Sequence, residues 1–193
     1  MCQSEKDLDI VESFQKALET DRKISVRVIK GKNYYVLSVN SNKIFEDLNK
    51  WGVTQNKSLI TKFPDFISDD LMPHFIRGYF DGDGSVWEGK RKIVTVKNEY
   101  KPGTTRDRII QNVKFNLTGS NDFITGLQSY LVEHVGFTKT KLNYSKSKKE
   151  HKHCTLEYSG RKNMKRFYDY IYKNATVFGE RKNNKFKKIL NNE

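Results

Sequence analysis

Residues 75–85 read Phe-Ile-Arg-Gly-Tyr-Phe-Asp-Gly-Asp-Gly-Ser, and this stretch decides the fold of the chain. Phe75, Gly78 and Tyr79 share one face of a helix, because residues three and four positions apart lie on the same side. A glycine on that face lets the backbone of a second helix approach closely. The spacing therefore predicts a helix interface formed by Phe75, Gly78 and Tyr79.

The residues that follow place two acids at the end of this helix. Gly82 and Gly84 predict the helix end, since glycine is frequent there, and the chain then enters a strand near Ser85. Asp81 is expected in the last helical turn and Asp83 just beyond it.

A calcium loop and an ordinary turn are two other interpretations of Asp-Gly-Asp-Gly-Ser. A calcium loop that begins at Asp81 needs glycine at its sixth position and glutamate at its twelfth, where this chain has Val86 and Lys92. The calcium interpretation therefore fails. A simple turn accounts for the aspartates and glycines. It does not account for the amphipathic helix before them or the basic strands after them.

Residues Ile76 to Gly84 resemble the signature nonapeptide of the LAGLIDADG homing endonucleases. Gly78 and both aspartates match, whereas Arg77 replaces the usual small residue at the second position. The resemblance implies an α+β fold in which an antiparallel β-saddle is backed by helices in the order αββαββα. It also implies that two such helices pack side by side, one from each half of a monomer or from each subunit of a dimer.

The same resemblance implies the residues of a site for phosphodiester hydrolysis. Asp83 would bind Mg²⁺ with help from the Gly82 carbonyl, whereas Asp81 would be a structural group. Paired Mg²⁺ ions supply an activated water and stabilise the leaving oxygen. Lys182 stands where the family tends to place a basic catalytic residue, and Lys57 is its counterpart. For both lysines the alternative is a charge that only positions phosphates.

The charge of the chain indicates a polyanionic partner. Its 193 residues include 36 Lys and Arg against 23 Asp and Glu, which gives a net charge of +13. Such an excess is typical of nucleic-acid binding, so we expect a double-stranded DNA target site as partner. We expect no membrane span or signal peptide, and two cysteines fit a reducing setting. The expected location is intracellular, in the cytoplasm or in an organelle matrix.

Basic and amide side chains after the motif predict the DNA contacts. Two long strands are expected at 85–97 and 108–118, and a second hairpin at 138–145 and 152–159. A β-ribbon in the major groove reads base edges with such side chains, and lysines beside it contact phosphates. The alternative for each residue is an ordinary solvent-facing side chain. The expected DNA-binding residues are Arg91, Lys97, Arg106, Arg108, Gln111, Lys114, Asn116, Lys139, Lys141, Lys146 and Lys148.

Local signals predict the remaining helices. Asn40 or Ser41 opens a helix that runs to about Trp51, and Ser68 or Asp69 caps the motif helix. The other helices are expected at 5–20, 120–134, 161–173 and 179–191.

The order of these elements recurs along the chain and predicts an internal repeat. Asp9 matches Asp122 with an offset of 113 (122 − 9), and Leu37 matches Leu156 with an offset of 119 (156 − 37). The chain is therefore expected to comprise a partial first repeat at 1–58, a connector at 59–69 and a complete repeat at 70–193.

This repeat would place the counterpart of the nonapeptide before the first residue (76 − 113 = −37). We therefore expect the first motif helix, its aspartate and its two long strands to lie outside this chain. Three explanations stay open. The chain is a fragment of a two-motif enzyme, or it pairs with a second chain, or it is a decayed endonuclease that keeps its DNA affinity.

The expected function is site-specific DNA cleavage with Mg²⁺ that gives a double-strand break. It would serve the mobility of an intron, an intein or a free-standing gene. The alternatives are a non-catalytic DNA-binding protein and an intron RNA maturase on the same fold.

Overall fold

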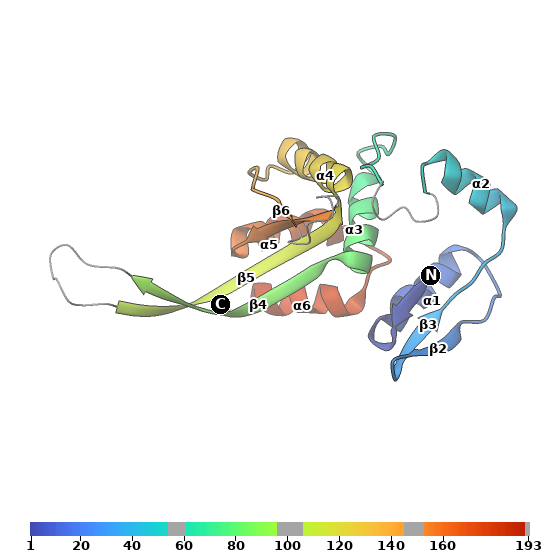
Figure 1. Ribbon diagram of the computed structural model, residues 1–193, viewed down its shortest axis with the longest axis horizontal. Coiled ribbons are helices and arrows are strands. Elements are labelled where there is room, and N and C mark those ends of the chain that lie inside the picture. The colour runs from blue at the N-terminus through green and yellow to red at the C-terminus, as the bar shows by residue number, and fades with distance from the viewer. Residues whose placement is uncertain (54–60, 96–105, 145–152, 192–193) are drawn as a thin grey trace.

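The computed structural model describes residues 1–53, 61–95, 106–144 and 153–191. These residues form two units, each with one antiparallel sheet, and the first unit lies beside the start of helix α6 of the second (Figure 1). The first unit, residues 1–53, contains β1 Cys2–Ser4, the 3-10 helix η1 Glu5–Asp7, α1 Leu8–Ala17, β2 Ser25–Ile29, β3 Lys32–Val36 and α2 Asn42–Lys50. The second unit contains α3 Met72–Asp83, β4 Ser85–Thr95, β5 Arg106–Ser120, α4 Asn121–His134, β6 Asn143–Tyr144, β7 His153–Ser159, α5 Arg161–Tyr172 and α6 Glu180–Asn191.

The second unit has the predicted α+β architecture. Its elements follow the order α3-β4-β5-α4-β6-β7-α5, which is the expected αββαββα, and α6 is added at the end. The four strands pair antiparallel in the order β4-β5-β7-β6, and the paired strands β4 and β5 extend away from the helices (Figure 1). The long β4–β5 ribbon thus starts from α3 and returns to α4, so both helices join the same end of it.

Side chains of the sheet alternate between a covered and an exposed face. Phe115 and Leu117 of β5 are fully buried among the helices, because alternate residues of a strand point to opposite sides. Phe115 stacks on Phe167 of α5 with ring centroids 4.1 Å apart, and Phe80 of α3 lies 5.2 Å from the same ring. The other side of the sheet, here called the open face, carries exposed or half-buried side chains: Trp87, Lys114, Asn116, Thr118, Thr155 and Glu157.

The strand registers of the two units match. Cys2 pairs with Val36 in the first unit, and Thr118 pairs with Thr155 in the second. The offsets are 116 (118 − 2) for one strand and 119 (155 − 36) for the other, and the second equals the offset expected from the sequence. The following helices match at 113, and the three residues of η1 account for the difference of three.

A pair of glutamines also occupies matching places. Gln15 of α1 donates its side-chain N–H to the carbonyl of Arg22 at 2.7 Å. Gln128 of α4, 113 residues later (128 − 15), donates to the carbonyl of Thr140 at 2.8 Å. Each glutamine thus fixes the segment that leads from the helix into the next strand.

Helices α2 and α5, which the predicted repeat would match, differ in how far their apolar faces are covered. Phe45 and Trp51 are each 58% exposed, and Leu48 is 36% exposed. Met164 and Phe167, which follow Phe45 and Leu48 by 119 residues (164 − 45 and 167 − 48), are fully buried. The apolar face of α2 therefore has no equivalent of the α3–β4–β5 core among the described residues.

Two local predictions are wrong. The motif helix begins at Met72 and not at Ser68 or Asp69, because Pro73 fits the first turn of a helix and the capping position is Leu71. The hairpin strand expected at 138–145 is reduced to the two residues of β6. The Thr140 carbonyl is bound by Gln128 instead of by a neighbouring strand.

The helices expected after Ser41 and at 120–134, 161–173 and 179–191 are confirmed, whereas the helix expected at 5–20 is divided into η1 and α1. Ser120 caps α4 by accepting from the Phe123 amide at 3.2 Å, and Ser41 caps α2 by accepting from the Ile44 amide at 3.3 Å. Helices α5 and α6 begin within one residue of the expected positions. No helix in the described part of the chain is both long and apolar enough to cross a membrane.

Candidate active site

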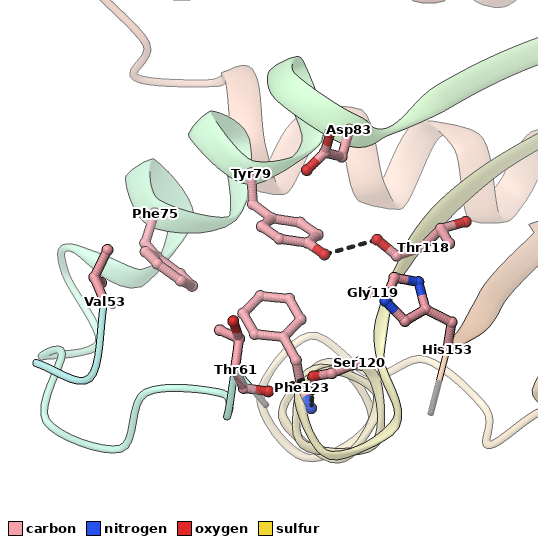
Figure 2. Close-up of a pocket in the computed structure, with 10 residues that line it drawn as sticks. All are labelled: Val53, Thr61, Phe75, Tyr79, Asp83, Thr118, Gly119, Ser120, Phe123 and His153. Carbon is pink, nitrogen blue, oxygen red and sulfur yellow. Dashed lines mark hydrogen bonds between the residues drawn. The ribbon is translucent and has the colours of Figure 1, made fainter. Parts of the chain in front are cut away.

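Asp83 is the last residue of α3, and its carboxylate is exposed beside a pocket under that helix. The pocket is lined by aromatic and polar residues of α3, β5 and α4 (Figure 2). Among the residues that the structure describes, none forms a hydrogen bond with the Asp83 carboxylate. The preceding Gly82 is exposed as well, so two consecutive residues at the helix end are accessible.

Asp81 occupies a different environment, although only Gly82 separates it from the exposed Asp83. It is 5% exposed, and its two oxygens accept from the Tyr172 hydroxyl at 2.7 Å and from the Gly179 amide at 2.8 Å. Burial raises the pKa of Asp81, and these two bonds and the nearby Lys182 oppose the rise. The two acids of the motif thus divide into one held inside the fold and one free at its surface.

Gly84 ends α3 for a steric reason. Its backbone has a φ of −78°, an ordinary value, so a left-handed conformation does not explain the glycine. A Cβ at this position would lie 2.2 Å from Cδ2 of Phe80, which fills the core below. The expectation that a glycine closes the helix is confirmed, but the requirement is space for Phe80.

Lys182 lies beneath the end of α3 and is only 6% exposed. Its amine donates to the carbonyls of Phe80 and Asp81, both at 2.8 Å. These carbonyls lie in the last turn of α3, where a helix has unpaired acceptors, and a cation there is favourable. The amine expected to be catalytic thus caps a helix. Its proposed counterpart Lys57 lies outside the described residues.

The buried amine of Lys182 predicts a stability that depends on pH. Burial lowers its pKa from 10.5 to about 8, against the opposing effect of Asp81. Between about pH 8 and pH 10.5 the unfolded chain therefore binds more protons, and the free energy of unfolding rises with pH. Relative to Lys182→Met, the wild type should gain stability across this window, as measured by urea unfolding at several pH values. An equal difference at all pH values would contradict the assigned burial.

Arg77 explains the departure from the family nonapeptide. It is 7% exposed and donates to the carbonyls of Ile171 at 2.9 Å and Val177 at 2.8 Å. Its third partner is the ring of His74, at 2.8 Å. Burial lowers the pKa of Arg77, which nearby Asp81 opposes. A small residue at this position would leave the end of α5 without these donors.

The three residues predicted to form the helix interface do not lie on the same surface of α3. Gly78 is exposed, and a Cβ there would meet no atom within 4 Å, so this side of α3 is open to a partner. Phe75 and Tyr79 instead pack inside the unit on Phe123, with Tyr79 stacked on it at 4.2 Å. The Tyr79 hydroxyl donates to the Thr118 carbonyl at 2.7 Å (Figure 2). Burial and Asp83 raise its pKa to about 12, so Tyr79 is a neutral donor near neutral pH.

Two of the predicted DNA-binding residues lie together on the open face. Lys114 and Asn116 are neighbours on one side of β5, and the Lys114 amine is 2.7 Å from Glu157 and 5.5 Å from the centre of the Trp87 ring. Trp87 was not expected to contribute, because nothing in the sequence distinguishes an exposed strand tryptophan from a core one.

The other predicted DNA-binding residues are distributed more widely. Gln111 lies on the opposite side of β5 from Lys114 and bonds to Glu88. Lys139 and Lys141 are exposed in the segment before β6. Three predicted arginines lie in the paired strands of the β4–β5 ribbon, and three predicted lysines lie outside the described residues. The arginines are Arg91, Arg106 and Arg108, and the lysines are Lys97, Lys146 and Lys148.

The family model of the LAGLIDADG-like domain matches residues 70–172. The chain belongs to the LAGLIDADG family. The matched LAGLIDADG domain contains Asp83 and the open face of the sheet but ends before Lys182 and α6. No curated protein sequence matches this chain.

Solved structures with the same fold are LAGLIDADG endonucleases. The I-LtrWI homing endonuclease bound to target DNA has a TM-score of 0.59 at 14% identity, and the match covers 98% of this chain and 77% of that one. Meganuclease I-SmaMI bound to uncleaveable DNA has a TM-score of 0.58 at 12% identity, covering 98% and 78%. Meganuclease I-AabMI bound to uncleaved DNA has a TM-score of 0.51 at 14% identity, covering 98% and 79%. At these identities the likeness establishes the LAGLIDADG fold.

Proposed function

We propose that this chain is a site-specific DNA endonuclease of the homing type. The observation that carries the proposal is Asp83, an exposed acid without a hydrogen-bond partner among the described residues, at the end of the motif helix. A buried, hydrogen-bonded acid such as Asp81 is already used by the fold, whereas Asp83 is available to a ligand. Three structures of the same fold were determined with DNA, and we carry that partner to this chain.

The residues at the end of α3 fit a divalent cation such as Mg²⁺. The Asp83 carboxylate and the Gly82 carbonyl are hard oxygen donors, and the end of a helix adds partial negative charge. Mg²⁺ takes one or two protein carboxylates and completes its shell with water and substrate phosphates. When bound, such ions activate a water and stabilise the leaving oxygen. Within the described residues no group of three or more metal-binding side chains is present, so further donors would come from DNA and a partner.

We further propose that the chain comprises a partial repeat at 1–58, a connector at 59–69 and a complete repeat at 70–193. The matched strand registers and the paired glutamines support this division. The exposed side of α3 at Gly78 would receive a second motif helix, from another segment or another chain. Double-strand cleavage would then require the aspartate of that second helix in addition to Asp83.

Selection of a target site from a randomised DNA library tests the function. The selected DNA is incubated with the chain and Mg²⁺, and with Ca²⁺ as a control for binding without turnover. Cleavage at one site with Mg²⁺ supports the endonuclease, and the genomic setting of that site would show whether the gene moves with an intron. Specific binding without cleavage, also when a second chain supplies the other motif helix, would instead indicate a DNA-binding protein on the same fold.

DNA affinity should depend steeply on salt. The net charge of +13 and the exposed lysines beside the sheet predict that several counterions are released on binding. Each phosphate contact contributes about −0.9 to the slope of log K against log salt. Removing Lys139 and Lys141 together should therefore make the slope shallower by about two if both contact phosphates. Lys43→Ala, in an exposed ion pair on α2, is the control and should leave the slope unchanged.

A further inference from the structure

The N-terminus of helix α6 binds one carboxylate from each unit of the molecule. The Gly179 amide donates to Asp81 of α3 at 2.8 Å, and the next amide, of Glu180, donates to Asp9 of α1 at 2.8 Å. Unpaired amides at the start of a helix favour negative groups. Two consecutive amides of one helix thus hold the first unit and the motif helix of the second unit.

Two basic residues in the first turn of α6 add contacts, one to the first unit and one to the end of α3. Arg181 makes a two-pronged bond to Asp7, with distances of 2.7 and 3.1 Å, and Ser4 donates to the same carboxylate at 3.0 Å. Burial raises the pKa of Asp7, but the bonds from Arg181 and Ser4 outweigh it, so the pKa is lowered overall. The adjacent Lys182 reaches the opposite way and binds the carbonyls at the end of α3.

Close packing leaves little room at the centre of this contact. A Cβ on Gly179 would lie 3.0 Å from Cδ1 of Ile10 and 3.3 Å from Cγ of Asp81. Helix α1, the turn before α6 and the end of α3 therefore meet at one backbone position. A shift of α1 would displace the start of α6, and with it the amine of Lys182.

We infer that the start of α6 is a joint through which the first unit positions the acidic end of α3. Asp7 and Asp9 are then positioning residues for Asp83, and Gly179, Arg181 and Lys182 transmit their effect. The amide of Gly84, bonded to the Phe80 carbonyl at 2.7 Å, reports on the same last turn. The catalytic part of the inference rests on the proposed endonuclease function, whereas the mechanical part does not.

Hydrogen exchange of the full chain tests the mechanical part without DNA or metal. Asp9→Ala removes the acceptor for the Glu180 amide, and exchange at residues 80–84 should become faster by about tenfold, as for the loss of a helix cap. Asp9→Asn keeps an acceptor oxygen and should restore most of the protection. The control is Asp122→Ala, since Asp122 occupies the matching place in α4, is exposed and has no hydrogen-bond partner among the described residues. Protection of β5 and β7 should stay unchanged in all three variants.

Cleavage of the selected DNA tests the catalytic part. Asp9→Ala should lower the single-turnover cleavage rate about tenfold at an unchanged DNA dissociation constant, and Asp9→Asn should recover most of that rate. Wild-type exchange at residues 80–84 in Asp9→Ala would overturn the joint, whether or not the wild type cleaves DNA. Faster exchange with an unchanged cleavage rate would overturn the positioning role. A wild type that does not cleave even when a second chain supplies the other motif helix would contradict the proposed function, and the joint is then decided by exchange alone.

Discussion

Asp83→Asn is expected to abolish DNA cleavage while the chain still binds its target. The substitution keeps the shape of the side chain but removes the negative charge that a hard cation needs. Asp83 makes no hydrogen bond within the described part of the chain, so the fold should not change. Binding should stay equal or become slightly tighter, because one carboxylate no longer repels the phosphates. Parallel cleavage assays with Mg²⁺ and binding assays with Ca²⁺ measure the two effects.

Asp81→Asn is the matched control, since it makes the same change two residues earlier. Asp81 accepts hydrogen bonds from Tyr172 and Gly179 inside the fold, and an amide cannot accept at both of its terminal atoms. We expect this variant to lose stability, as seen in urea unfolding, and to lose activity only to the extent that it unfolds. Full cleavage by Asp83→Asn would remove Asp83 from the catalytic assignment.

Phe167→Ala should lower the free energy of unfolding by about 3–5 kcal/mol. Its ring is fully buried, stacked on Phe115 at 4.1 Å and in contact with Phe80, so the substitution leaves a cavity in the centre of the second unit. Leu48→Ala changes the matching position of α2, where the side chain is 36% exposed, and should cost no more than about 0.5 kcal/mol.

Urea unfolding of the two variants beside the wild type measures this contrast. The comparison is internal, because both residues belong to matching helices of one chain (167 − 48 = 119). A large loss in Leu48→Ala would mean that the apolar face of α2 is covered in solution, for example by a second copy of the chain.

The motif helix and the sheet could be predicted because their signals are local. The spacing of Gly78, Asp81 and Asp83 and the capping serine Ser120 act within a few residues, and the structure follows them. The alternation of apolar residues along β5 likewise marks its buried face. The single long helix expected at 5–20 divides into η1 and a shorter α1, because Asp7 turns inward to reach Arg181.

The roles of several residues could not be predicted, since they depend on contacts between distant parts of the chain. Lys182 faces carbonyls more than 100 positions away, and Asp9 meets Glu180 across 171 positions. No periodicity in the sequence reports such pairs. The strand expected at 138–145 is shorter for the same reason, a contact with another part of the chain. The Gln128 side chain of α4 binds the Thr140 carbonyl, and β6 begins only at Asn143.

The length of β4 limits how many base pairs of DNA the β4–β5 ribbon can contact. Its 11 residues rise about 3.3 Å each, so the strand is about as long as ten base pairs of DNA. Because all four base pairs are distinguishable in the major groove, ten fully read positions distinguish on the order of 10⁶ sequences. A genome offers about 10⁶–10⁹ competing sites, so one ribbon reaches only the lower end of the required discrimination. We therefore expect that recognition of a single genomic site requires a second surface that contacts base edges beside this ribbon.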